Sequence, residues 1–106
     1  MANTYKNSKV DLTTTNETTL YSCPASTTAI VKSIIVSEDS GNADTITLTI
    51  SSGGSTFSIY KVKAVGANGT IELLIAPLVV QAEEGLKVTA ATADRLHVVA
   101  SYLEIT

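Results

Sequence analysis

The side chains able to perform chemistry are few and widely separated. The 106-residue chain has one cysteine, Cys23, one histidine, His97, and no tryptophan. Because a transition-metal site needs several Cys or His ligands close together, these two residues cannot complete one. No local motif of nucleophilic catalysis surrounds either of them. We therefore expect no catalytic, cofactor-binding or metal-binding residues, with Cys23 in or near the core and His97 on a strand facing solvent or a neighbour.

Paired acidic side chains could serve acid–base chemistry or bind calcium. Here they fall in segments that read as turns, and we expect them to keep these loops soluble: Glu38, Asp39, Asp44, Glu83, Glu84 and Asp94. The stretch 39–44 lacks the ligand spacing of a calcium loop and its closing glutamate. Weak calcium binding is the alternative.

The glycine-bearing loops and the tyrosines give no ligand site either. Gly53–Gly54 and Gly66–Gly69 precede no predicted helix, whereas a phosphate-binding loop does, so we expect tight turns. The tyrosines are spread along the chain instead of clustering into a stacking platform: Tyr5, Tyr21, Tyr60 and Tyr102. We expect some of them in the core and others at an interface.

Charge and hydropathy exclude two partner classes. The net charge is -3, the sequence pI is about 4.9, and the seven basic residues form no stripe, so we expect no nucleic-acid partner. The longest apolar run, 73–80, contains Pro77 and is too short to cross a membrane. Since the N-terminus has no apolar signal segment, we expect synthesis and folding in the cytoplasm of the producing cell.

Strand-forming residues dominate the chain, and helix formers are sparse. Short β-patterns alternate with turn residues. The predicted strands are 9–13, 18–23, 28–38, 45–51, 56–62, 70–75, 78–81, 86–91 and 95–106. We expect an all-β fold of about eight strands, an antiparallel β-sandwich or jelly-roll-like domain over 13–106, with a small barrel as the alternative and no helix. Residues 1–12 read as a polar N-terminal arm.

Alternation assigns faces to the strands. In 28–38 one face carries Ile30, Ile34 and Val36, interrupted by Lys32, and the other carries Val31 and Ile35. Two partly apolar faces predict a central strand. In 45–51 we expect Ile46, Leu48 and Ile50 inside and Thr45, Thr47 and Thr49 outside. In the closing strand Leu96, Val98, Ala100 and Tyr102 share a face.

Serine and threonine fill 27 of the 106 positions. Sheet faces covered by these residues are flat, uncharged and rich in hydrogen-bonding groups. Such faces suit permanent packing between subunits better than they suit a soluble monomer, which normally carries more charge.

Residues 18–36, TTLYSCPASTTAIVKSIIV, resemble a recurrent opening of small β-sandwich virion proteins of tailed bacteriophages. The later ANGTIELLIAPLVVQAEEGLKV and the closing LHVVASYLEI are similar in style to the same group. The likeness extends over most of 18–105. Its motifs are structural, so the resemblance implies a particle component and transfers no site residue.

Within this resemblance the first hypothesis is a non-enzymatic capsid decoration (cement) protein on the capsid surface of the virion. It would bridge neighbouring capsid subunits, with the major capsid protein or other virion proteins as partners. We expect a homo-oligomer, for which a trimer is one arrangement. The alternatives are a tail, neck or fibre-associated virion protein and, from another class, a small carbohydrate- or ligand-binding β-sandwich module.

Overall fold

A computed structural model describes residues 2–106 and confirms the all-β prediction. Its nine strands are β1 Asn3–Asp11, β2 Thr18–Ser22, β3 Thr28–Glu38, β4 Asp44–Ser52, β5 Ser55–Val65, β6 Thr70–Glu72, β7 Leu78–Val80, β8 Gly85–Ala90 and β9 Leu96–Ile105. No helix occurs within 2–106, and hence none that is long and apolar enough to cross a membrane.

The pairing scheme is that of one long hairpin rolled up on itself. β4 pairs with β5 at its tip, β3 pairs with both β6 and β7, β2 pairs with β8, and β1 pairs with β9. Two further ladders, β3 with β9 and β4 with β8, close the roll. All of these pairings are antiparallel, which gives sheet A in the order β1-β9-β3-β6, with β7 also on β3, and sheet B in the order β2-β8-β4-β5.

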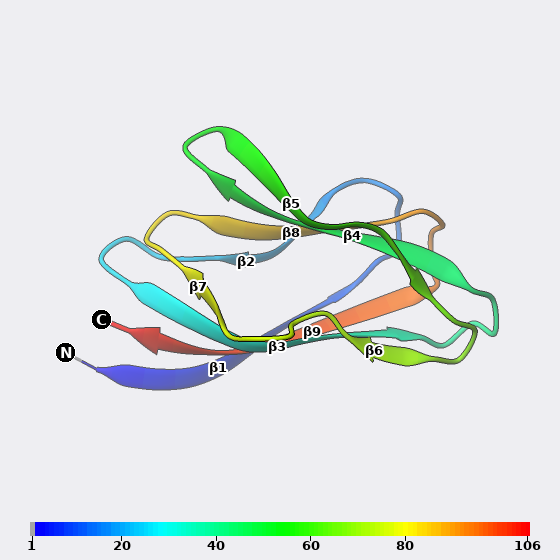
Figure 1. Ribbon diagram of the computed structural model, residues 1–106, viewed down its shortest axis with the longest axis horizontal. Coiled ribbons are helices and arrows are strands. Elements are labelled where there is room, and N and C mark those ends of the chain that lie inside the picture. Colours follow the sequence, from blue (N-terminus) through cyan, green and yellow to red (C-terminus); the bar gives the residue numbers. More distant parts are fainter. Residues whose placement is uncertain (1) are drawn as a thin grey trace.

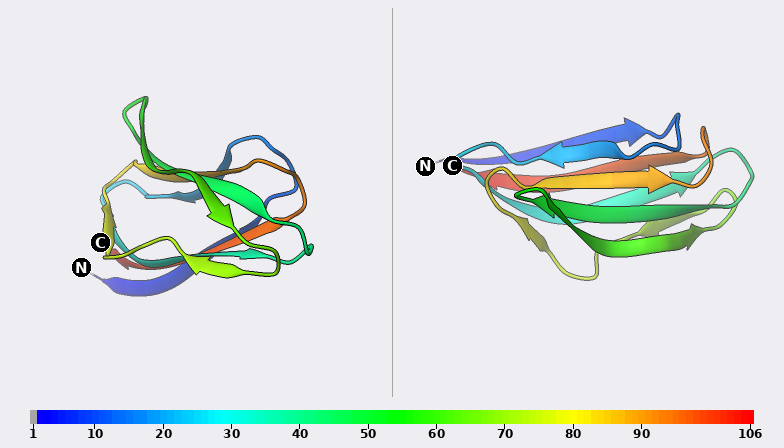
Figure 2. Two further views of the ribbon diagram at one scale, coloured as in Figure 1. Left: turned by 45° about the vertical axis from the view of Figure 1, so that its right-hand side comes forward. Right: turned by 90° about the horizontal axis from the view of Figure 1, so that it is seen from above.

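This strand order is the jelly-roll form of the β-sandwich, with β6 and β7 sharing the position of one interrupted strand. Figure 1 shows the two sheets as stacked layers, with the tip of the β4–β5 hairpin projecting beyond sheet B. Both ends of the chain lie at one corner (Figure 2), where Ala2 and Thr106 exchange backbone hydrogen bonds of 3.2 and 3.0 Å.

The core fills the space between the inner faces of the two sheets. Its largest fully buried side chains are Leu12, Val31, Ile34, Val36, Ile46, Leu48, Val65, Leu73, Val80, Leu86, Val88 and Leu96. Most alternate along their strands with outward-facing residues, because successive side chains of a strand point to opposite faces. The inward set predicted for the closing strand is confirmed, since Leu96, Val98, Ala100 and Tyr102 are all buried.

A β-bulge in β3 changes the faces predicted for that strand. Its register with β9 shifts between Val31 and Ser33, so Lys32 is the extra residue. Before the bulge the odd-numbered Val31 is buried, and after it the even-numbered Ile34 and Val36 are. The expectation that Ile30 shares a face with Ile34 was therefore wrong, because strict alternation does not hold across an inserted residue. Ile30 and Ile35 instead lie together on the outer face.

Strand β4 keeps its predicted alternation, although the burial of its residues is uneven. Ile46 and Leu48 are fully buried as expected, but Thr49 is also buried and Ile50 is only half-buried. The ladder to β8 is regular along β4, so Ile50, opposite the buried Leu86, still faces the core, and Thr49 points outward with Lys87. The register shifts on both sides of Leu48 place the extra residues in β5. The Thr49 Oγ1 atom is buried and has no hydrogen-bond partner in the described chain.

The first strand is longer than the sequence predicts. Residues 1–12 read as a polar arm with a strand only from Lys9, whereas β1 begins at Asn3 and pairs with β9 along its whole length. Its side chains are mostly exposed, so local polarity conceals the pairing.

The core assignment predicts a large difference between two similar substitutions. Leu48→Ala, at a fully buried site, should lower the free energy of unfolding by about 2–5 kcal/mol. Ile75→Ala, where the side chain is 96% exposed, should change it by less than about 0.5 kcal/mol. Chemical denaturation of both variants checks this, and equal losses would contradict the assigned core.

Candidate binding surface

Cys23 and His97 lie in different environments, Cys23 in the core and His97 at the surface. Cys23 is buried, as expected, with its thiol 3.4 Å from the Thr27 carbonyl oxygen. His97 lies on the outer face of β9, where Nε2 is 3.2 Å from Asp11 Oδ1 and Nδ1 is 3.4 Å from Asp39 Oδ2. Since a neutral imidazole has one N–H, only the protonated ring can donate to both carboxylates. No set of three or more His, Cys, Asp or Glu side chains within 2–106 could hold a metal ion.

Two of the acidic residues that we expected to keep turns soluble are instead buried and accept hydrogen bonds from backbone N–H groups. The expectation was therefore wrong for these two. Asp44 accepts hydrogen bonds from the backbone N–H groups of Thr45, at 2.8 Å, and Thr92, at 3.1 Å. Glu38 accepts from the N–H groups of Ser40, Gly41 and Asn68 at 2.8–3.0 Å. Loop N–H groups that no strand satisfies need an acceptor when they are buried, and these carboxylates supply it.

The environment of Glu38 keeps its carboxylate ionised. Burial alone would favour the neutral form, but hydrogen bonds from Ser40, Asn68 and Gly41 outweigh it and lower the pKa of Glu38 to about 2. Glu38 therefore acts as a fixed negative centre that holds two loops, 39–41 and 66–69, to the end of β3.

Glu72 performs the same task at the bulge in β3. Its carboxylate accepts from the N–H groups of Ile34, at 2.7 Å, and Leu74, at 3.1 Å, and from the Ser33 hydroxyl. Burial opposes ionisation, but these hydrogen bonds prevail and lower the pKa of Glu72. The residue satisfies backbone groups where the chain leaves β6 and the sheet edge is interrupted.

Glu104 forms a buried network that the sequence analysis missed. It accepts from Tyr21 Oη at 2.6 Å and from Lys6 Nζ at 2.8 Å, joining sheet B to sheet A. The hydrogen bond from Lys6, then that from Tyr21, lowers the pKa of Glu104 against the effect of burial. Burial and the bond to Glu104 raise the pKa of Tyr21, so its hydroxyl stays a donor. The signal was available, because Glu104 continues the inward period of Leu96 to Tyr102.

The outer face of sheet A carries apolar side chains that are not covered. Paired residues of an antiparallel sheet point to the same side, so the register defines rows across the strands. The tyrosine row contains Tyr5, Leu103, Ile30 and Val79. The charged row, further along the strands, contains Lys9, Val99, Ile35 and Glu72. Tyr5 is 73% exposed, and Ile35, Val79 and Val99 are also exposed.

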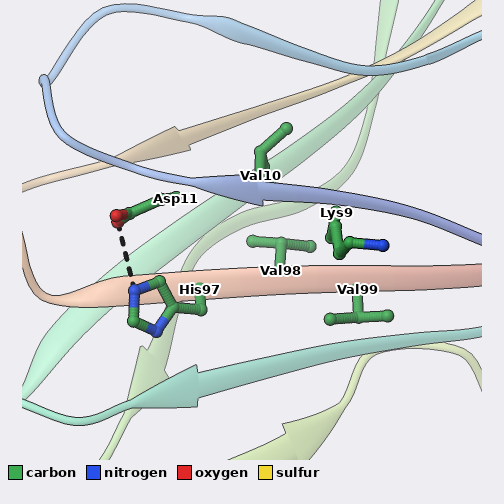
Figure 3. A pocket seen from close by; sticks show the side chains of 6 residues that line it. All are labelled: Lys9, Val10, Asp11, His97, Val98 and Val99. Atoms are coloured by element: carbon green, nitrogen blue, oxygen red, sulfur yellow. Dashed lines mark ion pairs between the residues drawn. The ribbon is translucent and has the colours of Figure 1, made fainter.

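Two shallow hollows open on this same face. One, of about 440 Å³, lies between β1 and β9 and is lined by Lys9, Val10, Asp11, His97, Val98 and Val99. Figure 3 shows Val99 and Lys9 along it and the His97–Asp11 ion pair at its end. The second, of about 310 Å³, is lined by Tyr5, Lys6, Asn7, Lys32, Ser101 and Tyr102. The tyrosines as a set form no platform, because Tyr21 and Tyr102 pack together inside, with ring centroids 4.2 Å apart.

A second exposed apolar surface lies on sheet B, along strand β5 of the hairpin. We call it the hairpin surface and define it by two separate exposed side chains of β5, Phe57 and Val62, which are 57% and 60% exposed. Phe57 lies near the hairpin tip and points to the same side as its partner Ile50, and Val62 lies five residues further along the strand. Val62 has φ 55°, a left-handed conformation that is rare for a β-branched residue. Its N–H donates to Thr47 Oγ1 at 3.1 Å. Strand β5 has a β-bulge at this point, as its register shows: Ile46 pairs with Lys63, and Leu48 pairs with Tyr60. The local backbone is therefore strained while it presents a valine to solvent.

Comparison with known proteins gives a likeness of fold only. No protein-family model matches the chain, and no curated protein matches it. Two solved structures of a pentameric capsid protein isolated from metagenomic phage sequences are similar, each with a TM-score of 0.46 and 18% identity. The alignments cover 93% of this chain but only 59% and 60% of those chains, so this chain spans about three fifths of their length. Resemblance at this level does not transfer a role.

The Glu104 network predicts a specific loss on removal of one hydroxyl. Tyr21→Phe deletes the donor to a buried carboxylate and should lower the free energy of unfolding by about 1.5–3 kcal/mol. The half-buried Tyr60 is the matched control, for which the same substitution should cost less than about 0.5 kcal/mol. Equal effects in denaturation experiments would show that the network does not hold the sheets together.

The depressed pKa of Glu38 predicts a dependence of stability on pH. Its contribution is complete above 4.5, the ordinary pKa of a glutamate, and is lost as the pH falls toward the folded-state pKa of about 2, where the carboxylate takes up its proton. Glu38→Gln should therefore be less stable than the wild type at pH 7, and the gap should narrow between pH 4.5 and 2. Urea titrations at several pH values measure it; a gap that is constant with pH would contradict an ionised cap.

Proposed function

We propose that this protein is a non-enzymatic structural component of a phage virion, a capsid decoration protein that bridges neighbouring subunits. The observation that carries the proposal is the presence of two separate exposed apolar surfaces on opposite layers of the sandwich. One is the outer face of sheet A, with Tyr5 and Val99, and the other is the hairpin surface, with Phe57 and Val62. A protein that bridges two neighbours needs two contact surfaces, and exposed apolar patches mark such contact sites.

The conformation of Val62 adds weight to the hairpin surface. A non-glycine residue held in a left-handed conformation costs about 1–3 kcal/mol, and such residues gather at functional sites. Here the strain serves no buried contact, because Val62 is exposed. The jelly-roll fold itself supports the proposal only by analogy, since viral capsid domains and lectins share it.

The decisive experiment is the stoichiometry of this chain in purified particles of the phage that encodes it, measured by quantitative mass spectrometry. A decoration protein should be present in many copies, in proportion to the capsid subunit. A few copies tied to the symmetry of the tail would favour the tail or neck alternative. Absence from particles, together with measurable affinity for glycans, would favour the ligand-binding module.

Val62→Gly separates the proposed contact from folding. Glycine adopts φ 55° without strain, so the variant should be at least as stable as the wild type. It should nevertheless bind undecorated heads at least several-fold more weakly, because the exposed valine is lost. Thr19→Ala, an exposed change elsewhere on sheet B, is the control and should bind normally. Unchanged binding of Val62→Gly in a head-pelleting assay would remove the hairpin surface from the proposal.

A further inference from the structure

The outer face of sheet A has the pattern of a self-complementary contact. We infer that two copies of this chain pack through these faces about a twofold axis that runs parallel to the strands. Such a contact is isologous: where one residue of the first copy meets another residue of the second, the same two residues also meet with the copies exchanged. It forms between isolated chains and does not depend on any role in a virion. A dimer of this kind would still bridge capsid neighbours, through one hairpin surface from each copy.

The rows described above show the complementarity. A twofold axis along the strands, between β9 and β3, lays β9 of one copy over β3 of the other and β1 over β6 and β7. In the tyrosine row Leu103 then faces Ile30 and Tyr5 faces Val79 of the second copy. In the charged row Val99 faces Ile35. Apolar side chains therefore meet apolar ones in both rows.

Charge selects this arrangement. Lys9 stands at the β1 end of the charged row and Glu72 at the β6 end. The twofold rotation brings Lys9 of each copy over Glu72 of the other, which makes two opposite-charge pairs at the two edges. The hydrogen bonds that lower the pKa of Glu72 keep that end of the row negative. A rotation about an axis across the strands would instead set Lys9 against Tyr5 and leave Glu72 over Val79.

The size of the face suits a contact between two copies. Four strands about 4.8 Å apart and nine residues of about 3.3 Å each outline roughly 550 Å², or about 1,100 Å² for both copies, near the lower bound for a specific interface. The row between the tyrosine row and the charged row carries the small polar residues Asn7, Ser101 and Ser33, which allow the two copies to approach closely. Lys32, whose ammonium lies 6.0 Å from the Tyr5 ring centre, has a side chain long enough to carry its charge to the rim.

The test is the oligomeric state of the purified full chain, measured by sedimentation equilibrium over a wide concentration range. The wild type should be a dimer. Val99→Lys places an unpaired charge at the centre of the contact and should weaken self-association at least about a hundredfold. Phe57→Lys puts the same charge on an exposed apolar residue of sheet B, 57% exposed against 37% for Val99, and this control should dimerise like the wild type.

Two more variants make the result specific. Ser101→Arg tests the same face should Val99→Lys fold poorly, as judged by circular dichroism, and it should also be monomeric. Lys9→Glu turns both edge pairs from attractive to repulsive and should weaken the dimer about tenfold, more at low salt than at high salt. A wild-type monomer, a trimer, dissociation by Phe57→Lys, or a dimer that survives both Val99→Lys and Ser101→Arg would overturn the inference.

Discussion

The antiparallel ladder between β3 and β9 is the interaction on which the rest of the structure depends. It joins the middle of the chain to its closing strand over Thr28–Glu38, and β1, β6 and β7 attach to sheet A only through these two strands. The inner side of this ladder supplies a large part of the core. Its outer side supplies the rows of the exposed apolar face, so one ladder sets both the stability of the fold and the surface offered to partners.

Acidic residues hold the loops of this framework rather than performing chemistry. Glu38, Asp44 and Glu72 each accept hydrogen bonds from two or more backbone N–H groups. Glu104 joins the two sheets through Tyr21 and Lys6. Four of the ten acidic side chains are thus committed to holding the framework together. This leaves the apolar and threonine-covered strand faces as the parts that can contact other molecules.

The sequence predicted the fold class and most strands because hydrophobic alternation is a local signal. It failed where the period was broken. The bulge at Lys32 reversed the faces of β3 and hid the joint exposure of Ile30 and Ile35. The role of Glu38 was out of reach for another reason, since one of its donors, Asn68, lies 30 residues away. The paired β1 was concealed because its side chains are polar and its bonds are made by backbone. The rows of exposed residues could not be predicted either, because finding them requires the register in which the strands pair, and residue spacing alone does not provide it.

The adjacency of Ala2 and Thr106 has a mechanical consequence. Because β1 and β9 are antiparallel and end together, a force that separates the two termini loads their ladder from one end and breaks its hydrogen bonds in succession. A force applied across the layers, through the outer faces, is instead shared by the whole core at once. The molecule is therefore weak when it is peeled from its ends and strong when it is compressed or pulled through its sheets.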